Sequence, residues 1–246
     1  MTMRGRVWIT PEVVSWTPRQ EAGWVVDQSA LRRGYTIWQH ASDRLKAGAN
    51  EMDRADAITT LKRCLNQRLR VIEAAYKLRR FLRLNNTRYL EALSQLGLAR
   101  PMLIQHLLKV RNAIEHEDKA PPRLRRCLEM LDVVWYFLRT TDRLVGAKTH
   151  MFILEPDETS RYGLEVEVVI KRVWTASVRG WLPHELLSYS PIVGCFGVRP
   201  DKLQAANSWK KQGQHLDKLD TDIYLSGSVT EIPDKIAFAR AYFEAH

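Results

Sequence analysis

Residues 52–84 carry the feature that most limits the fold of this chain, a long apolar stripe that repeats at helical spacing. Its members step along the sequence by three or four positions: Ile58, Leu61, Leu65, Leu69, Ile72 and Tyr76. Because an α-helix turns once every 3.6 residues, this spacing predicts a long amphipathic helix. Its outer surface is strongly basic, with Glu73 as the opposing charge: Lys62, Arg63, Arg68, Arg70, Lys77, Arg79, Arg80 and Arg83.

Further helical segments follow this helix. We predict that it ends near Asn85 and Asn86, that a short helix covers about 89–96, and that another begins at Pro101 and stops before the Pro121–Pro122 pair. A last helix over about 123–145 has a regular apolar face: Leu124, Leu128, Leu131, Trp135, Leu138 and Val145. Residues 51–148 therefore predict an all-helical bundle of four to five helices.

The two ends of the chain lack the continuous helical pattern of the middle and contain segments with the pattern of β-strands. Residues 1–50 form an N-terminal extension of uncertain structure, with short β-branched runs first and a helix near 28–46. Residues 163–174 alternate apolar and acidic side chains, which predicts a half-exposed strand. Weaker strand candidates are 151–154, 195–198 and 223–225, the polar stretch 200–220 is predicted as loop or helix, and a final helix is predicted from Pro233 to Phe243. Residues 149–246 are thus a smaller mixed α/β or β-rich accessory domain, and the fold class is α+β.

Three tryptophans, Trp8, Trp16 and Trp24, are evenly spaced in the N-terminal extension. Such a series could stack on nucleic-acid bases. Buried core anchors are the favoured interpretation, because the large apolar area of Trp dominates its energetics.

Charge is the unusual bulk property of the 246 residues. The chain has 38 Lys and Arg against 28 Asp and Glu, a net charge of +10. Residues 51–150 hold 20 basic and 11 acidic side chains, whereas residues 151–246 hold 11 and 13. A basic excess of this kind is typical of proteins with an anionic partner, most often nucleic acid and sometimes a membrane surface, and a merely solvated basic surface is an equally open alternative.

Three separated cysteines, Cys64, Cys127 and Cys195, predict neither a disulfide framework nor a zinc site. The first residues lack the apolar core of a secretory signal, and the longest apolar run, at 133–138, is too short to cross a bilayer. We expect a cytoplasmic protein without membrane contact.

The stretch RNAIEHED, residues 111–118, carries the candidate chemistry. Arg111 is a permanent cation suited to phosphate oxygens, and His116 titrates near neutral pH. With Asn112 as a polar contact to ribose or phosphate, these groups suffice for RNA cleavage without a metal. The alternative is ordinary helix chemistry, in which Arg111 pairs with Glu115 and His116 benefits from the helix dipole.

Ideal helix geometry does not favour the catalytic interpretation within one chain. Five positions separate Arg111 from His116, which corresponds to about 140° around the helix. Either the helix end distorts, or a second copy completes the site, so we expect a homodimer with the active site in the cleft between copies.

No other motif in the sequence indicates a specific chemistry. HELLS at 184–188 lacks the second histidine of a zincin helix, and the sequence offers neither a phosphate-binding glycine loop nor a nucleophile elbow. We therefore expect no metal and no cofactor.

The middle of the chain resembles the HEPN family (higher eukaryotes and prokaryotes nucleotide-binding domains). The signature is R-N-x-x-x-H at Arg111, Asn112 and His116, set between ADAITTLKRCLNQRLRVIEAAY and CLEMLDVVWYFLRTTD. The resemblance covers about 52–146 and implies a dimeric, metal-independent endoribonuclease of a kind frequent in bacterial toxin–antitoxin and antiviral defence systems. It implies that His116 is the general acid and base, that Arg111 stabilises the phosphate, and that Asn112 supports it.

The resemblance has one departure and one alternative. Family toxins that are silenced by adenylylation carry a Tyr where this chain has Asp118, so we do not expect that form of control, although an antitoxin or regulatory protein remains an expected partner. The acidic residues Glu115, Glu117 and Asp118 oppose phosphate binding. The alternative function is a non-catalytic RNA- or nucleotide-binding dimerisation module. The candidate RNA contacts are Arg79, Arg80, Arg83 and Lys109.

Overall fold

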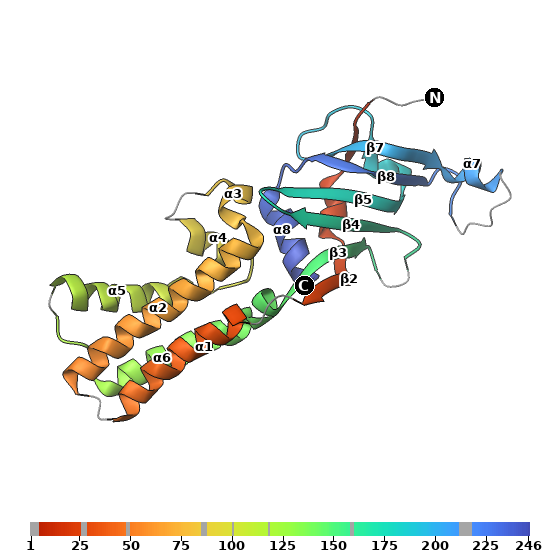
Figure 1. The fold of residues 1–246 in the computed structure, drawn as a ribbon. Coiled ribbons are helices and arrows are strands. Elements are labelled where there is room, and N and C mark those ends of the chain that lie inside the picture. The colour runs from red at the N-terminus through yellow and green to blue at the C-terminus, as the bar shows by residue number, and fades with distance from the viewer. Residues whose placement is uncertain are drawn as a thin grey trace. The chain divides into compact units, whose positions relative to one another are not determined.

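The computed structural model describes residues 5–25, 29–47, 50–84, 88–99, 101–117, 119–157, 160–211 and 218–246. The chain forms two compact units (Figure 1). The helical unit is Val25–Lys148, and the sheet unit joins Met1–Trp24 to Thr149–His246. The predicted α+β class is confirmed. Residues 1–50, set apart in the sequence as one extension, are divided between the two units.

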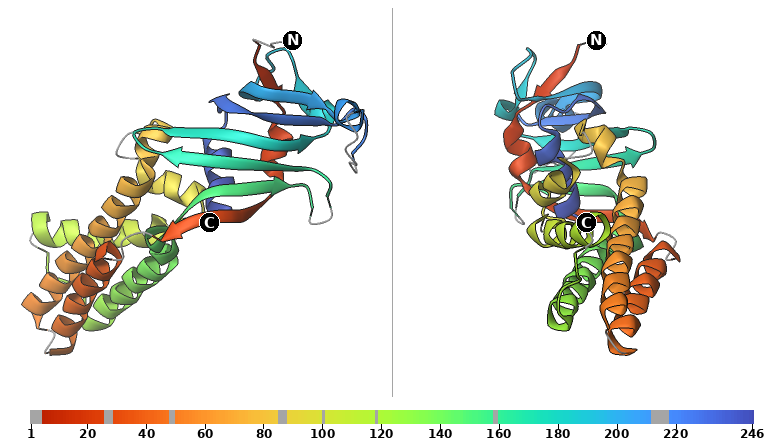
Figure 2. Two further views of the ribbon diagram at one scale, coloured as in Figure 1. Left: turned by 45° about the vertical axis from the view of Figure 1, so that its right-hand side comes forward. Right: turned by 90° about the vertical axis from the view of Figure 1, so that its left-hand side faces the viewer.

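The helical unit contains the predicted helices. They are α1 (Ser29–Ala47), α2 (Glu51–Tyr76), α3 (Leu78–Leu82), α4 (Tyr89–Gln95), α5 (Pro101–Glu117) and α6 (Leu124–Gly146). The views of Figure 2 show α1, α2 and α6 side by side, and these three helices contact one another pairwise. The segment near 28–46 is therefore a full member of the bundle, as α1.

The apolar stripe of α2 forms the centre of the core. Ile58, Leu61 and Leu65 are fully or almost fully buried in one cluster with side chains of α1, α5 and α6. The Asn50 side chain accepts a hydrogen bond from the backbone N–H of Asp53 and caps the helix start. The helix ends earlier than predicted, because Lys77 takes a left-handed conformation with φ of 50° before α3 begins. The predicted stop at 85–86 lies outside the described residues.

The buried face of α6 differs from the prediction. Leu131, Leu138 and Val145 are buried as expected, whereas Leu124, Leu128 and Trp135 have 39%, 40% and 36% of their area exposed. Unpredicted core positions take their place: Cys127, Met130, Val134 and Phe137. The buried stripe of α6 is thus rotated from the stripe inferred by spacing alone.

The helical unit contains an ion pair whose cation is completely buried. The side chain of Arg68 is completely buried, and both of its terminal nitrogens donate to Oδ1 of Asp142 at 3.0 Å. The hydroxyl of Tyr35 donates to Oδ2 of the same carboxylate at 2.5 Å. The prediction that Arg68 belongs to the basic outer surface is therefore wrong. Its ion pair with Asp142, together with the hydrogen bond from Tyr35, instead connects α1, α2 and α6.

The sheet unit is a single antiparallel sheet in the order β2-β3-β4-β5-β8-β7-β1-β6. Its strands are β1 (Val7–Ile9), β2 (Thr17–Val25), β3 (Ala147–Glu155), β4 (Gly163–Ile170), β5 (Trp174–Leu182), β6 (Leu187–Ser188), β7 (Phe196–Ala205) and β8 (Ile223–Glu231). Residues 163–174 were predicted as one strand, but the chain turns between Ile170 and Trp174 and pairs these two residues across a hairpin. The polar stretch 200–220 contains the end of β7 and the short helix α7 (Ala206–Lys210).

The C-terminal helix α8 (Lys235–Glu244) packs on one face of this sheet (Figure 1). Trp174 of β5 contacts three aromatic rings of α8: Phe238, Tyr242 and Phe243. The favoured interpretation of the tryptophan series is confirmed for Trp8 and Trp16, which are each 8% exposed. Trp24, in contrast, is 54% exposed and stacks on His150 with ring centroids 4.4 Å apart.

The buried ion pair generates a stability prediction. Replacing Arg68 with Ala leaves the Asp142 carboxylate with Tyr35 and with Arg139, whose Nη1 is 3.5 Å from Oδ2, and it opens a cavity, so we expect a loss of about 3–5 kcal/mol in the free energy of unfolding. Arg70→Ala, two residues along the same helix and exposed, should change it by less than about 0.5 kcal/mol. Urea unfolding followed by circular dichroism compares the two. Equal, small losses would contradict the structural role of Arg68.

Candidate active site

The signature residues lie together at the C-terminal end of α5. Nη1 of Arg111 is 3.1 Å from Oδ1 of Asn112, to which it donates, and 3.4 Å from Nε2 of His116. Arg111 and His116 therefore meet within one chain, without the second copy that was one of the two ways in which the sequence allowed them to meet. The angle between their Cα positions does not decide the matter, because the long Arg side chain bends along the helix and reaches the imidazole.

The contact between Arg111 and His116 depends on the tautomer of the imidazole ring. A guanidinium has N–H donors but no acceptor, so the contact is a hydrogen bond only in the tautomer whose Nε2 carries no proton. An unprotonated Nε2 beside a permanent cation has the properties of a general base next to a phosphate-binding group. His116 is exposed, so a substrate can reach it.

Arg111 also makes the ion pair that the alternative interpretation predicts. Its Nη2 contacts Oε2 of Glu115, and the other oxygen of Glu115 accepts a hydrogen bond from Thr59 on α2 at 3.2 Å. The Arg111 side chain is only 17% exposed. A phosphate that binds Arg111 must therefore compete with a carboxylate of the same helix. Asp118, the third acidic residue of this segment, lies outside the described residues.

A groove next to Arg111 gathers further cations. It has a volume of about 550 Å³ and lies between α1, α2 and α5, and five of its residues are basic: Arg33, Lys62, Arg63, Arg70 and Arg111. Glu115 is the acidic residue among those that line it. Partial burial, and then the charge of Arg111, lower the pKa of the Lys62 ammonium. The groove therefore has the charge of an anion-binding site.

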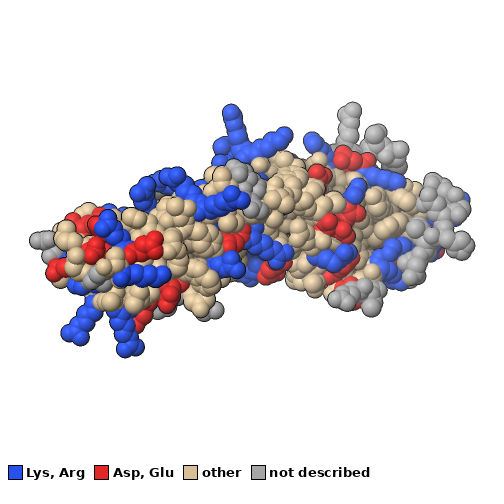
Figure 3. Space-filling view, turned by 60° about the horizontal axis from the view of Figure 1, so that its bottom comes forward, with Lys and Arg blue, Asp and Glu red and all other residues tan. Residues whose placement is uncertain are grey.

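The basic excess of the chain belongs to this unit. Residues 25–148 contain 24 Lys and Arg against 13 Asp and Glu, a net charge of +11, so the remainder of the chain has a net charge of −1. On the face drawn in Figure 3, Lys and Arg side chains stand out in several groups from the surface of the helices. Arg33 was missed in the sequence, because nothing in its neighbourhood shows that α1 packs along α2 and lines the groove.

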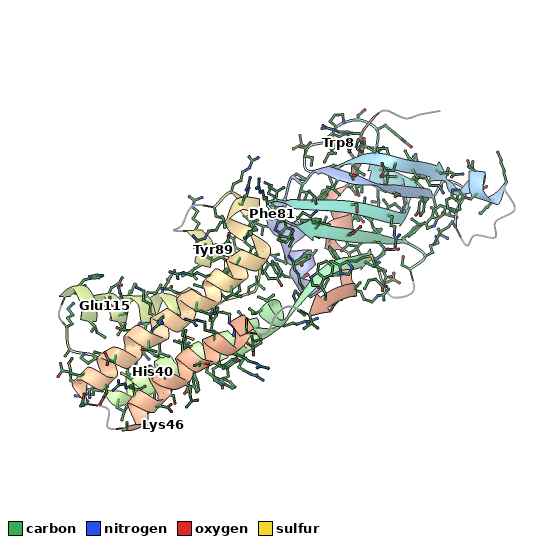
Figure 4. The ribbon with its side chains drawn as sticks, viewed as in Figure 1. Trp8, His40, Lys46, Phe81, Tyr89 and Glu115 are labelled. Carbon is green, nitrogen blue, oxygen red and sulfur yellow. The ribbon has the colours of Figure 1, made fainter. Side chains whose placement is uncertain are left out.

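The candidate RNA contacts on α3 lie away from this groove. Thr59 of α2 touches Glu115, and the 17 residues from Thr59 to Tyr76 span about 25 Å before α3 begins. Figure 4 labels Glu115 at one end of the helical unit and Phe81 of α3 at the other. The structure thus brings Arg111, Asn112 and His116 together, but it does not bring α3 to them.

The four candidate contacts differ in exposure. Arg80 and Arg83 of α3 and Lys109 of α5 are exposed. Arg79 is half-buried, and its guanidinium lies over the ring of Tyr89, 4.5 Å from the centroid. Burial, and then the neighbouring Glu73, raise the pKa of that tyrosine. Arg79 therefore has a packing role within the unit.

Among the residues that the structure describes, no group of three or more His, Cys, Asp and Glu side chains is placed to hold a metal ion. The HELLS stretch forms a 3₁₀ turn, His184–Leu186, followed by the short strand β6, so His184 does not sit on a zincin-type helix. The three cysteines are buried free thiols, and burial raises the pKa of Cys64 to about 12.

The Glu115 contact generates a prediction that separates a phosphate site from an ordinary helix pair. Glu115→Gln removes the competing charge but keeps an oxygen for Thr59, so RNA should bind up to about fivefold more tightly, which corresponds to about 1 kcal/mol. Glu117→Gln is the matched control, because Glu117 pairs with Lys119 at 2.5 Å in solvent. Fluorescence anisotropy with labelled RNA measures both. Unchanged or weaker binding by Glu115→Gln would count against a phosphate at Arg111.

Comparison with known proteins adds no relative. No family model, curated protein or solved structure matches this chain. Among the described helices, none is both long enough and apolar enough to span a bilayer.

Proposed function

We propose that the helical unit is a metal-independent endoribonuclease of the HEPN type. The observation that carries this proposal is the 3.4 Å approach of Arg111 Nη1 to His116 Nε2 beside a basic groove. A base and a permanent cation within reach of one phosphodiester are what cleavage by the ribose 2′-hydroxyl requires.

The reaction follows from these two groups. Nε2 of His116 takes the proton of the 2′-hydroxyl, and the oxygen attacks the adjacent phosphorus. The bond from phosphorus to the 5′-oxygen breaks, the 5′-oxygen takes a proton, and the products are a 2′,3′-cyclic phosphate and a 5′-hydroxyl. Arg111 stabilises the negative charge that builds up on the phosphoryl oxygens. Asn112 holds the guanidinium through its Oδ1.

A homodimer supplies what one site lacks. One His116 cannot hold a proton for the leaving oxygen while it removes one from the 2′-hydroxyl, so a second His116 from another copy is the natural acid. The helical unit also has an exposed apolar face: Leu124, Leu128 and Trp135 are four and seven residues apart on one side of α6. Exposed apolar faces of this kind are typical of protein interfaces.

The biological setting is proposed from the signature alone. The resemblance of Arg111, Asn112 and His116 to the HEPN motif supports a bacterial toxin or antiviral defence role, with RNA as the target. The sheet unit, which is nearly neutral, would then bind an antitoxin or regulatory protein or gate the nuclease.

A second function is supported by a specific observation, the ion pair between Arg111 and Glu115. An Arg that is already paired suits a module that binds RNA or nucleotides without cutting them. Such a module would bind through exposed cations, including Arg80, Arg83 and Lys109.

Cleavage of total RNA and of a defined tRNA, with chelator present, separates the two functions. We expect the wild type to produce fragments ending in 2′,3′-cyclic phosphate, and Arg111→Ala and His116→Ala to lose at least about 100-fold in rate. His106→Ala is the matched control. His106 is also exposed on α5 and also contacts a guanidinium, but that guanidinium belongs to Arg126, whose Nη2 lies 2.7 Å from Nε2 of His106, and not to Arg111.

The opposite result would favour the binding module. RNA that all four proteins bind and leave intact, with weaker binding after neutralisation of Arg80 and Arg83, would contradict the nuclease.

A further inference from the structure

The groove beside Arg111 holds cations without partners. Among the residues that the structure describes, Arg33, Lys62, Arg63 and Arg70 form no ion pair with a carboxylate. Some basic residues elsewhere on the unit are paired, as Arg44 is with Asp53 and Arg126 with Glu129. Four unpaired cations that meet in one depression repel one another, and a bound anion removes that repulsion.

The cations follow a line along α2. Lys62, Arg63, Asn66 and Arg70 are spaced by one, three and four residues, so they share one side of the helix. From Thr59 to Arg70 the line is about 16 Å long. A single phosphate would contact only part of it, whereas a stacked nucleic-acid strand, which advances about 3.4 Å per nucleotide, fills it with about five nucleotides.

We propose that this groove is the substrate track of the helical unit and binds one single-stranded RNA segment along α2. The scissile phosphate lies at Arg111 and His116, and the neighbouring phosphates lie on Lys62, Arg63, Arg70 and Arg33. This inference rests on the proposed ribonuclease function, since the strand is positioned for cleavage at the α5 end of the groove.

A single strand fits the groove better than a duplex does. Packed helices lie about 8–10 Å apart, so a depression between α1, α2 and α5 admits one strand but not the width of a double helix. Its floor also suits unpaired bases, because Ile37 and Val71 are half-buried apolar side chains and Asn66 presents an amide that pairs with base edges. Bases locked inside a duplex cannot reach these groups.

Lys62 occupies the key position on this track. It lines the groove with Arg111, and the charge of Arg111 contributes to lowering its pKa. Lys62 and Arg111 can therefore contact the same phosphate from two sides. In this way Lys62 positions the strand next to Arg111 and His116. We assign it as a positioning residue, because it contacts the substrate backbone and takes no part in proton transfer.

The test measures binding of a labelled single-stranded RNA of 12 nucleotides as a function of salt, with cleavage blocked by His116→Ala in every protein. Lys62→Gln and Arg70→Gln should each weaken binding and reduce the slope of log affinity against log salt by about 0.7, the value for one phosphate contact on a single strand. The same sequence as a duplex should bind more weakly than the single strand.

A control variant and a double variant on α3 distinguish binding in the groove from binding elsewhere on the unit. Arg125→Gln removes one charge from a side chain that is 94% exposed on α6, and it should leave the slope unchanged. Urea midpoints verify that all variants fold. Unchanged slopes for Lys62→Gln and Arg70→Gln would overturn the track, and so would a loss confined to the double variant Arg80→Gln, Arg83→Gln, which would move the strand to α3.

Failure of the track and failure of the nuclease give different results. If the proteins that retain His116 cut RNA while Lys62→Gln and Arg70→Gln bind normally, the groove is not the track but the ribonuclease stands. If these two variants lose binding while no protein cuts, the groove binds a strand that Arg111 and His116 do not cleave.

Discussion

The buried ion pair between Arg68 and Asp142 determines which side chains of α2 face the groove. A fully buried guanidinium must have its charge satisfied inside the protein, and the carboxylate of α6 together with Tyr35 of α1 provides this. This fixes the rotation of α2 about its own axis. Arg63, Asn66 and Arg70 lie about 140–160° around the helix from Arg68, so they must face outward into the groove. An interior ion pair thereby sets which cations α2 offers to a substrate.

Arg111 pairs with the carboxylate of Glu115, and under the proposed function it would also bind the phosphate of the substrate. The structure holds the guanidinium of Arg111 at the groove and next to His116. Under the proposed function, the four unpaired cations of the groove would attract that phosphate as well, so Glu115 would weaken RNA binding without preventing it. The contact between Arg111 and Glu115 is compatible with both interpretations of the RNAIEHED stretch.

The helices were largely predictable because their apolar residues recur at a regular period and their ends carry proline or a capping side chain, as Asn50 does at α2. Partner-dependent features were not predictable. In the sequence, Arg68 cannot be distinguished from the other basic residues of α2, because its partner Asp142 lies 74 residues later. Leu124, Leu128 and Trp135 have core spacing, but the neighbours of α6 bury a different stripe. Residues 1–24 gave no sign that β1 would pair between β6 and β7, because pairing across some 180 residues leaves no local pattern.

For the candidate site, the sequence identified the groups but not their arrangement. Arg111, Asn112 and His116 were found from residue types, while ideal helix geometry required either a distorted helix end or a second copy to join Arg111 to His116. The length of the Arg111 side chain, which a helical wheel ignores, joins them within one chain. Arg33 depends on the tertiary fold and had no signal of its own.

The most direct measurement of the central claim uses an RNA oligonucleotide whose cut position has been mapped. One version has a 2′-deoxynucleotide at that position and ribose everywhere else. If Arg111 and His116 act by 2′-hydroxyl attack, this version must bind with the same affinity and resist cleavage at that position. Cleavage that continues there would mean that water is the nucleophile, and it would contradict the assigned roles of His116 and Arg111.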